Sequence, residues 1–405
     1  MDKKNNPVIR FHNYKELWEY DRLKNIFRTI RNAFVGTATP YYVEKGHFYL
    51  ESNNVKNGKI NYNSQIFIND EFYEKQRDKW LKTNDIVMVQ SGHVGHTAVI
   101  PEELDNTAAH ALIVFTDYNK EVNPHFLNYQ FQSNSKRKEL DLISTGNTIK
   151  HILASEMKSF KMDLPTIEEQ TAIGSLFRTL DDLLASYKEN LANYQSLKAT
   201  MLTKMFPKAG QTIPEIRLDG FEGEWKIKRA DEIFKSVSEK NRALLPVLSA
   251  SQIDGMVLRD EIGIDIKYDE AALNNYKVVK PGQFVIHLRS FQGGFALSKL
   301  EGITSPAYTI IDFIDKKNNI PDFWNSILTS RDFIKRLETV TYGIRDGKSI
   351  SFKDFSSLKF VYPELEEQQA TGSYFANLEN VIAAHREKIT QLETLKKKLL
   401  QDMFI

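Results

Sequence analysis

The 405-residue sequence contains no cysteine, so disulfide bonds, thiolate catalysis and cysteine-ligated zinc are excluded. It also has no apolar run close to the roughly 20 residues that a membrane-spanning helix needs; Ala108–Phe115 is among its longest runs. The residues Met1–Asn6 are polar and lack the apolar centre of a signal peptide. Together these absences predict a cytoplasmic protein.

Motifs of several enzyme classes are also missing. The 12 prolines are never adjacent, so the Asn/Asp-Pro-Pro-aromatic motif of amino-directed DNA methyltransferases is absent. The sequence has no Gly-x-Gly-x-x-Gly for a nucleotide cofactor, no Gly-x-Ser-x-Gly nucleophile elbow and no His-Glu-x-x-His zinc motif. His93 and His96 have the spacing of a ligand pair, but two loop histidines without a third ligand disfavour a metal site. We expect a non-catalytic chain without a cofactor or metal of its own.

One segment ends like a phosphate-binding loop. Gly347, Lys348 and Ser349 match the end of Gly-x-x-x-x-Gly-Lys-Ser/Thr, whose backbone N–H groups wrap the phosphates of a nucleotide. Tyr342 stands where the first glycine should be, and residues 338–341 are typical of a helix end rather than of a buried strand. This mismatch argues against a nucleoside triphosphate site.

Composition favours an ordinary globular chain of two or three domains, with 41% hydrophobic and 26% charged residues. The formal net charge is only +1, which by itself gives no indication of a nucleic-acid partner.

The chain contains two copies of the same plan. Pro165–Phe206 and Pro363–Phe404 align without a gap, and 16 of 42 positions are identical. Pro7–Phe27 similarly matches Pro214–Phe234, keeping a proline, an Ile-Arg pair and a tryptophan. Pro207–Gly223, rich in proline and glycine, joins the copies. The sequence therefore predicts a tandem of two units, each a globular segment followed by a helical one.

The repeated segments have the heptad seam of helices that pair in a coiled coil. The seam positions are Ile173, Phe177, Leu180, Leu184, Tyr187, Leu191 and Tyr194 in the first copy, and Phe375, Leu378, Ile382, His385, Ile389 and Leu392 in the second. Thr166 and Glu169 predict a capping box at the first helix start, whereas Glu364 replaces the threonine in the second copy. A helix of about 40 residues would span about 60 Å. Packing of each helix on its own domain is the alternative, but two equal helices favour mutual antiparallel pairing.

The globular segments, residues 7–160 and 214–358, mix short β-branched and aromatic runs with helical stretches. Asp85–Gly92 and Gln283–Ser290 each read as a strand between a turn and a glycine-containing loop. We expect α+β domains with a twisted sheet and long exposed loops.

The order globular–helical–globular–helical, with Pro-x-x-Glu-Glu-Gln opening each long helix and Ile-Arg…Trp opening each globular half, resembles the specificity (S) subunit of type I restriction–modification enzymes. The resemblance covers essentially the whole chain, and at the helix starts its one departure is Glu364 in place of threonine. It implies two target-recognition domains, 1–160 and 207–360, that each read one half of a bipartite double-stranded DNA site. It also implies long spacer helices, within 161–206 and 361–405, that pair antiparallel and dock two methyltransferase (M) subunits.

The same resemblance assigns the chemistry to the partner subunits. The M subunits would use S-adenosylmethionine to methylate adenine N6, and restriction (R) subunits would use ATP with Mg²⁺ for translocation and cleavage. Each predicted domain has only two more basic than acidic residues. We therefore expect the partner subunits to supply much of the phosphate binding.

Candidate DNA-binding residues lie in glycine-containing and hydroxyl-bearing loops. Arg and Gln suit bidentate contacts with guanine and adenine, and small hydroxyl side chains suit phosphate contacts. The predicted residues are Thr37, Thr39, Gln90, Ser91, His93, His96, Asn147, Lys150, Ser249, Ser251, Gln252, Arg289, Ser290, Gln292, Arg345 and Lys348. For each of them an ordinary surface role is the alternative, and for Arg345 and Lys348 it is a solvated turn.

Candidate M-subunit-binding residues lie near the start of each long helix. They are Glu168, Glu169, Gln170 and Phe177 in the first copy, and Glu366, Glu367, Gln368 and Phe375 in the second. Two other functions stay open at this point. One is a coiled-coil scaffold without DNA specificity, and the other is a nuclease, although no metal-binding carboxylate set is recognisable.

Overall fold

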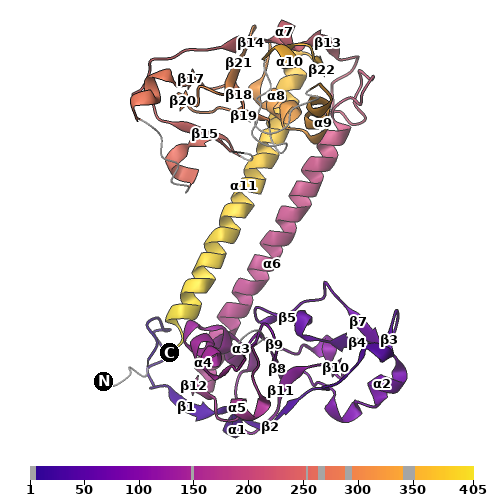
Figure 1. Ribbon diagram of the computed structural model, residues 1–405, viewed down its shortest axis with the longest axis vertical. Coiled ribbons are helices and arrows are strands. Elements are labelled where there is room, and N and C mark those ends of the chain that lie inside the picture. The colour runs from indigo at the N-terminus through magenta and orange to yellow at the C-terminus, as the bar shows by residue number, and fades with distance from the viewer. Residues whose placement is uncertain (1–5, 147–149, 252–253, 263–269, 288–293, 341–351) are drawn as a thin grey trace. The chain divides into compact units, whose positions relative to one another are not determined.

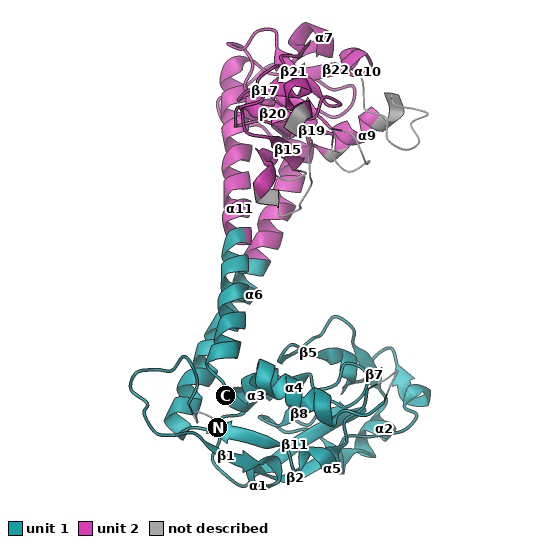
Figure 2. Cartoon of the chain, turned by 60° about the vertical axis from the view of Figure 1, so that its left-hand side comes forward, with its two compact units in different colours: residues 1–188, 387–405 teal, residues 189–386 magenta. Residues whose placement is uncertain are grey.

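The structure, a computed structural model, describes residues 6–146, 150–251, 254–262, 270–287, 294–340 and 352–405. The chain divides into two compact units (Figure 2). Unit 1 comprises Met1–Lys188 and Glu387–Ile405, and unit 2 comprises Glu189–Arg386. Each unit therefore contains one globular segment, part of one long helix and the complementary part of the other. The predicted domain boundaries at residues 160, 206 and 360 stay a prediction.

Unit 1 is built on two four-stranded sheets (Figure 1). The first is antiparallel with the order β2-β11-β8-β9: Phe27–Asn32, Leu112–Tyr118, Ile86–Val89 and Thr97–Val99. The second has the order β10-β4-β7-β3: Ala108–Ala109, His47–Leu50, Ile66–Ile68 and Tyr42–Val43. Two antiparallel pairs complete it, β1 (Glu19–Arg22) with β12 (Lys161–Leu164) and β5 (Val55–Lys56) with β6 (Lys59–Ile60).

The helices of unit 1 lie between these strands in the chain, except α6, which follows the last of them. They are α1 (Leu23–Ile26), α2 (Asp70–Glu74), α3 (Pro124–Gln132), α4 (Asn134–Ile143), α5 (Ala154–Met157) and the first part of α6 (Ile167–Lys204). Side-chain caps explain the starts of α3 and α4, because Asn123 accepts from the Phe126 amide and Ser133 from the Lys136 amide.

Unit 2 repeats the central antiparallel sheet of unit 1 and its β1–β12 strand pair. Its antiparallel sheet has the order β14-β21-β18-β19: Phe234–Val237, Thr309–Phe313, Phe284–Ile286 and Phe295–Leu297. β13 (Lys226–Arg229) pairs with β22 (Lys359–Tyr362) as β1 pairs with β12. The other pairs are β15 (Leu248–Ser251) with β16 (Gly255–Leu258) and β17 (Lys277–Val279) with β20 (Gly302–Thr304).

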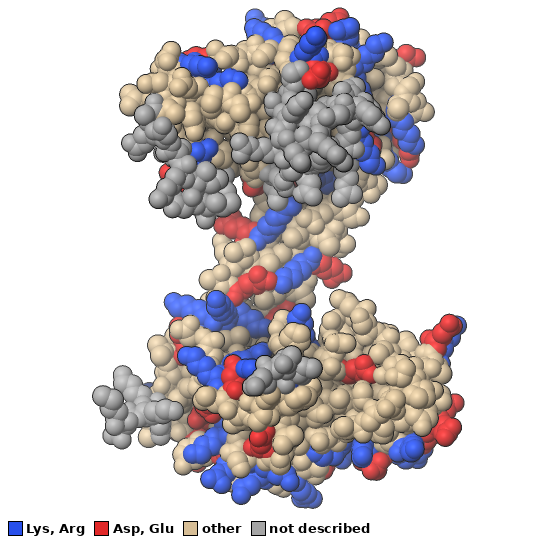
Figure 3. All heavy atoms as spheres, in the orientation of Figure 1, with Lys and Arg blue, Asp and Glu red and all other residues tan. Residues whose placement is uncertain are grey.

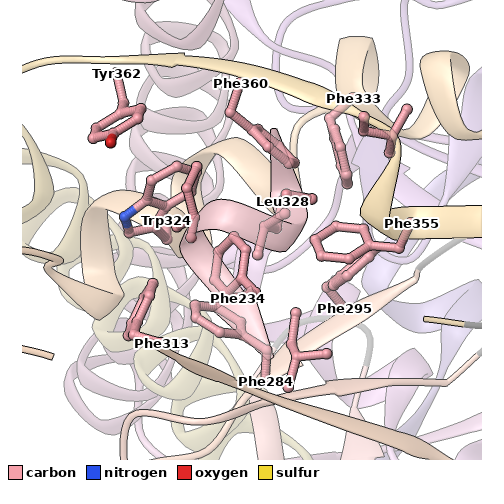
Figure 4. Packing of buried hydrophobic residues seen from close by; sticks show 14 of the residues in the cluster. Phe234, Phe284, Phe295, Phe313, Trp324, Leu328, Phe333, Phe355, Phe360 and Tyr362 are labelled. Atoms are coloured by element: carbon pink, nitrogen blue, oxygen red, sulfur yellow. The ribbon is translucent and has the colours of Figure 1, made fainter. Parts of the chain in front are cut away.

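The helices of unit 2 are α7 (Ala230–Ile233), α8 (Pro321–Leu328), α9 (Arg331–Val340), α10 (Phe352–Ser356) and the first part of α11 (Leu365–Asp402). Its core is aromatic (Figure 4). Trp324 is fully buried, and its ring centroid lies 5.1 Å from that of Phe234 and 5.4 Å from that of Phe360. Its indole N–H donates to Asn319, so the buried polar atom is paired.

The two long helices pair antiparallel within each unit. In unit 1, Asp181 and Lys188 of α6 form ion pairs with Lys396 and Glu393 of α11, so rising numbers on one helix meet falling numbers on the other. In unit 2 Lys198 pairs with Glu379, and Tyr194 lies edge-on to His385. All predicted seam positions are buried or half-buried. The predicted α+β class with two paired long helices and an internal repeat is confirmed.

Candidate nucleic-acid interface

Two predicted loops of unit 1 lie side by side. The loop after β8 contains Gln90, and its carbonyl accepts a hydrogen bond from the Ile152 amide at 2.9 Å. The Gly92 amide donates to the Lys150 carbonyl at 3.0 Å, and Ser91 and His151 form an isolated antiparallel β-bridge. The structure thus joins the loop after β8 to the segment between α4 and α5. The Lys150 ammonium pairs with the exposed carboxylate of Asp141 at 2.9 Å, and Asn147 lies outside the described residues.

His96 ends the same loop and is half-buried, whereas His93 is exposed. The Nδ1 atom of His96 accepts from the Asn57 amide at 3.3 Å and lies 3.4 Å from Nη2 of Arg137. Burial, followed by the charges of Arg137, His93 and Lys56, lowers the pKa of His96 to about 4. At neutral pH the ring is therefore uncharged, and with Nδ1 as acceptor its Nε2 carries the proton.

The hydroxyl loop of unit 1 lies beside the second sheet. Thr37 and Thr39 are both exposed. The carbonyl of Gly36 lies 3.0 Å from Nε2 of His110, whose other ring nitrogen is 3.4 Å from the Glu51 carboxylate. The bond to Glu51 raises the pKa of His110. This contact holds one end of the loop and leaves both threonine side chains at the surface.

In unit 2 the described candidates are two serines of β15. Ser249 accepts from Nε of Arg259 at 3.0 Å, and Ser251 bonds to Asp254 within a turn. The remaining predicted DNA-binding residues of this unit lie outside the described residues: Gln252, Arg289, Ser290, Gln292, Arg345 and Lys348.

The predicted partner-binding residues fall into two groups. Glu168 and Glu366 are exposed. Glu169, Gln170, Phe177, Glu367, Gln368 and Phe375 are buried and make contacts inside their own units. The side chains of these six are packed within the chain. Their contact with another subunit stays a prediction.

The buried residues explain why the same motifs occur in both copies. Gln170 accepts from the Asn123 amide and donates to the Pro165 carbonyl, at 3.0 and 2.9 Å. Gln368 makes the same pair of bonds with Ile320 and Pro363, at 3.2 and 3.0 Å. These bonds fasten the start of each long helix to the helix that follows the central sheet.

Only one of the two hydrogen bonds of the predicted capping box forms at the start of the first long helix. Thr166 accepts from the Glu169 amide at 3.4 Å, but the Glu169 carboxylate binds the guanidinium of Arg10. The Ile-Arg and Glu-Glu-Gln motifs, far apart in the sequence, are therefore direct partners. Both motifs are visible in the sequence, and their joint repetition in the two copies is the signal that could have paired them.

The described residues contain no group of three or more His, Asp or Glu side chains that could hold a metal ion. Among the helices of the described ranges, none has the length and hydropathy needed to cross a membrane.

Comparison with known proteins decides the family. The model of the type I restriction modification DNA specificity domain matches twice, over residues 15–220 and 222–394. The chain belongs to this specificity family. The two matches cover the two copies of the repeat, and they support recognition of DNA, without catalysis by this chain, as its function. The scaffold without DNA specificity is not favoured.

Relatives of this specificity chain extend over its full length. The type I restriction enzyme MjaVIII specificity subunit of Methanocaldococcus jannaschii is 22% identical and aligned over 97% of this chain and 96% of its own length. The putative MjaX specificity subunit of the same organism is 23% identical over 95% and 92%. The crystal structure of a type I S subunit from M. genitalium has the same fold, with a TM-score of 0.64, 14% identity and 99% of each chain covered.

Proposed function

We propose that each unit reads one half of a bipartite double-stranded DNA site and that the chain positions the other subunits of a type I enzyme on it. The observation that carries this proposal is the duplication. Both units have the same central strand order and the same fastening of the long helix, and each matches the DNA specificity family. Two equivalent readers in one chain suit a site with two separately read halves.

Base reading in unit 1 is assigned to the joined loops that carry Gln90, Ser91, His93, His96 and Lys150. The neutral His96 offers a ring N–H as a donor, and Gln90 offers an amide that can bond an adenine edge. Thr37 and Thr39, in the loop beside the second sheet, suit phosphate contacts. In unit 2 the serines of β15 and the predicted arginine- and glutamine-bearing loops have the corresponding role.

The partners are two methyltransferase subunits and, for cleavage, restriction subunits. S-adenosylmethionine, and ATP with Mg²⁺, are bound by those subunits, and adenine N6 is the methylated atom. Each unit contains parts of both long helices, which supports one docking surface per unit. The surface of unit 1 includes the exposed Glu168, and that of unit 2 includes the exposed Glu366. The complex works in the cytoplasm, where the host DNA is.

Exchange of residues 1–160 for the corresponding segment of another family member tests the proposal. Methylome sequencing of the host should then show a site with one new half and one unchanged half. Deletion of the chain should remove methylation at the whole site. An unchanged methylated sequence after the exchange would show that unit 1 does not read DNA.

A further inference from the structure

A basic groove lies in unit 1 where the globular segment meets the middle of α6 and the C-terminal part of α11. Its volume is about 680 Å³, and six cationic and two acidic side chains line it, which leaves a net charge of +4. The cationic residues are Lys56, Lys59, Arg137, Lys188, Lys396 and Lys397. Lys and Arg side chains gather at this end of α11 on the face seen in Figure 3.

Part of this charge is neutralised inside the groove. The Asp181 carboxylate lies 2.6 Å from the Lys396 ammonium and 3.8 Å from that of Lys59, and it accepts from the Tyr129 hydroxyl at 2.8 Å. Lys188 pairs with Glu393 at 2.6 Å. Within the described residues, no ion pair joins Lys56 or Lys397 to a carboxylate, and both side chains are exposed.

Comparison of the two repeats shows which lysines of the groove serve helix pairing and which do not. At the offset of 198 residues, Asp181 and Lys396 correspond to Glu379 and Lys198, which form the equivalent ion pair in unit 2. Lys397 corresponds to Ala199. The ion pair is thus part of the helix pairing in both units, whereas the lysine beside it occurs in one copy only. Helix pairing does not account for that lysine.

The groove continues into the predicted base-reading loop. Asn57 and Arg137 line the groove, and both contact the ring of His96 at the end of that loop. Burial lowers the pKa of the Arg137 guanidinium, so an incoming anion would compensate a charge that the fold has partly desolvated. A cluster of unneutralised cations repels itself and is stabilised by anions.

We propose that this groove binds backbone phosphates of the DNA whose bases unit 1 reads, with Lys56 and Lys397 making the phosphate contacts. The inference rests on the proposed DNA-reading function and adds the two long helices to the DNA-contacting surface. An acidic protein surface is the other occupant that the charge could suit. Only three of the 14 lining residues are apolar, Leu184, Ala185 and Leu400, which favours DNA over a protein surface.

The test is the salt dependence of DNA binding by the complex assembled from the full chain and methyltransferase subunits. The probes are two fluorescein-labelled duplexes, one carrying the methylated site found by methylome sequencing and one of random sequence. In the double variant Lys56→Ala/Lys397→Ala, the slope of log K against log salt should fall by about two on both duplexes, about one for each phosphate contact. The double variant Lys56→Arg/Lys397→Arg should keep the slope.

The control is the double variant Lys45→Ala/Lys75→Ala. It removes the same charge from exposed positions of the same unit outside the groove, and it should leave the slope unchanged. An unchanged slope in the Lys56/Lys397 alanine variant overturns the proposal. The proposal is also overturned if the alanine variant no longer assembles with methyltransferase subunits while the salt dependence of the chain's own DNA binding is unchanged. The groove would then bind a protein. If the unaltered complex does not prefer its methylated site to the random duplex, the proposed function itself fails.

Discussion

Arg10 donates two hydrogen bonds to the carboxylate of Glu169, from Nε to Oε1 and from Nη2 to Oε2, both at 2.7 Å. Arg217 and Glu367 repeat this arrangement in unit 2 at 2.6 Å. The glutamate side chains are 0% and 5% exposed, so water cannot replace the guanidinium. In both units the pair ties the segment before the first strand to the start of a long helix.

Removal of this guanidinium should destabilise unit 1. Arg10→Ala leaves the Glu169 carboxylate buried without its cation, and we expect a loss of about 3–5 kcal/mol in the free energy of unfolding. Urea titration followed by tryptophan fluorescence measures the change. Arg229→Ala is the control, because it breaks an ion pair with Asp231 that is exposed, and its unfolding midpoint should hardly move. Equal midpoints for Arg10→Ala and the unaltered chain would contradict this assignment.

Two equivalent phenylalanines should act on separate units. Phe404 packs on Phe126, Phe177 and Trp18 of unit 1, and Phe206 packs on Phe323, Phe375 and Trp225 of unit 2. Phe404→Ala should cost about 3–5 kcal/mol, and Phe206→Ala less, because Phe206 is only half-buried. Amide hydrogen exchange read by mass spectrometry should show faster exchange only in the unit that carries the change. If both variants increased amide exchange in the same peptides, the two units would not have separate cores.

Acid should destabilise unit 1 through His96. Its pKa is about 4 in the folded chain and about 6.5 in an unfolded one, so between these values the unfolded chain binds more protons. The free energy of unfolding should therefore fall as the pH drops from 7 towards 4, by about 1–2 kcal/mol after allowance for solvent screening of a half-buried ring. His96→Asn should lose this component. NMR titration of the ring checks the cause, and a ring pKa near 6.5 would refute it.

The length of α6 should set the unread gap between the half-sites. Four helix-forming residues added near Asn190–Asn193 lengthen the helix by about 6 Å and turn its end by about 40°. The paired helix must accommodate a local stutter, which coiled coils tolerate. Methylome mapping should show the same two half-sequences with a gap longer by one or two base pairs, given a rise of roughly 3.4 Å for each. Full activity with an unchanged gap would exclude the helices as the spacer.

The features that the sequence determined by itself are those written in local or repeated patterns. The heptad seams from Ile173 to Tyr194 and from Phe375 to Leu392 predict the long helices, because burial on a helix follows its own period. The match of Pro165–Phe206 to Pro363–Phe404 predicts the tandem plan, which the repeated strand order confirms. These signals need only the spacing of residues along one chain.

Only the tertiary structure decided which side chains meet. Glu169 and Gln170 are predicted partner contacts, and the structure adds that both bind distant residues of their own unit, Arg10 and Asn123. The loops of Gln90 and Lys150 became one surface through backbone hydrogen bonds. The basic groove is assembled from a hairpin, α4 and both long helices, so no sequence window contains its charge. Electrostatic fields add in space and not along the chain, which is why a net charge of +1 concealed a cationic site.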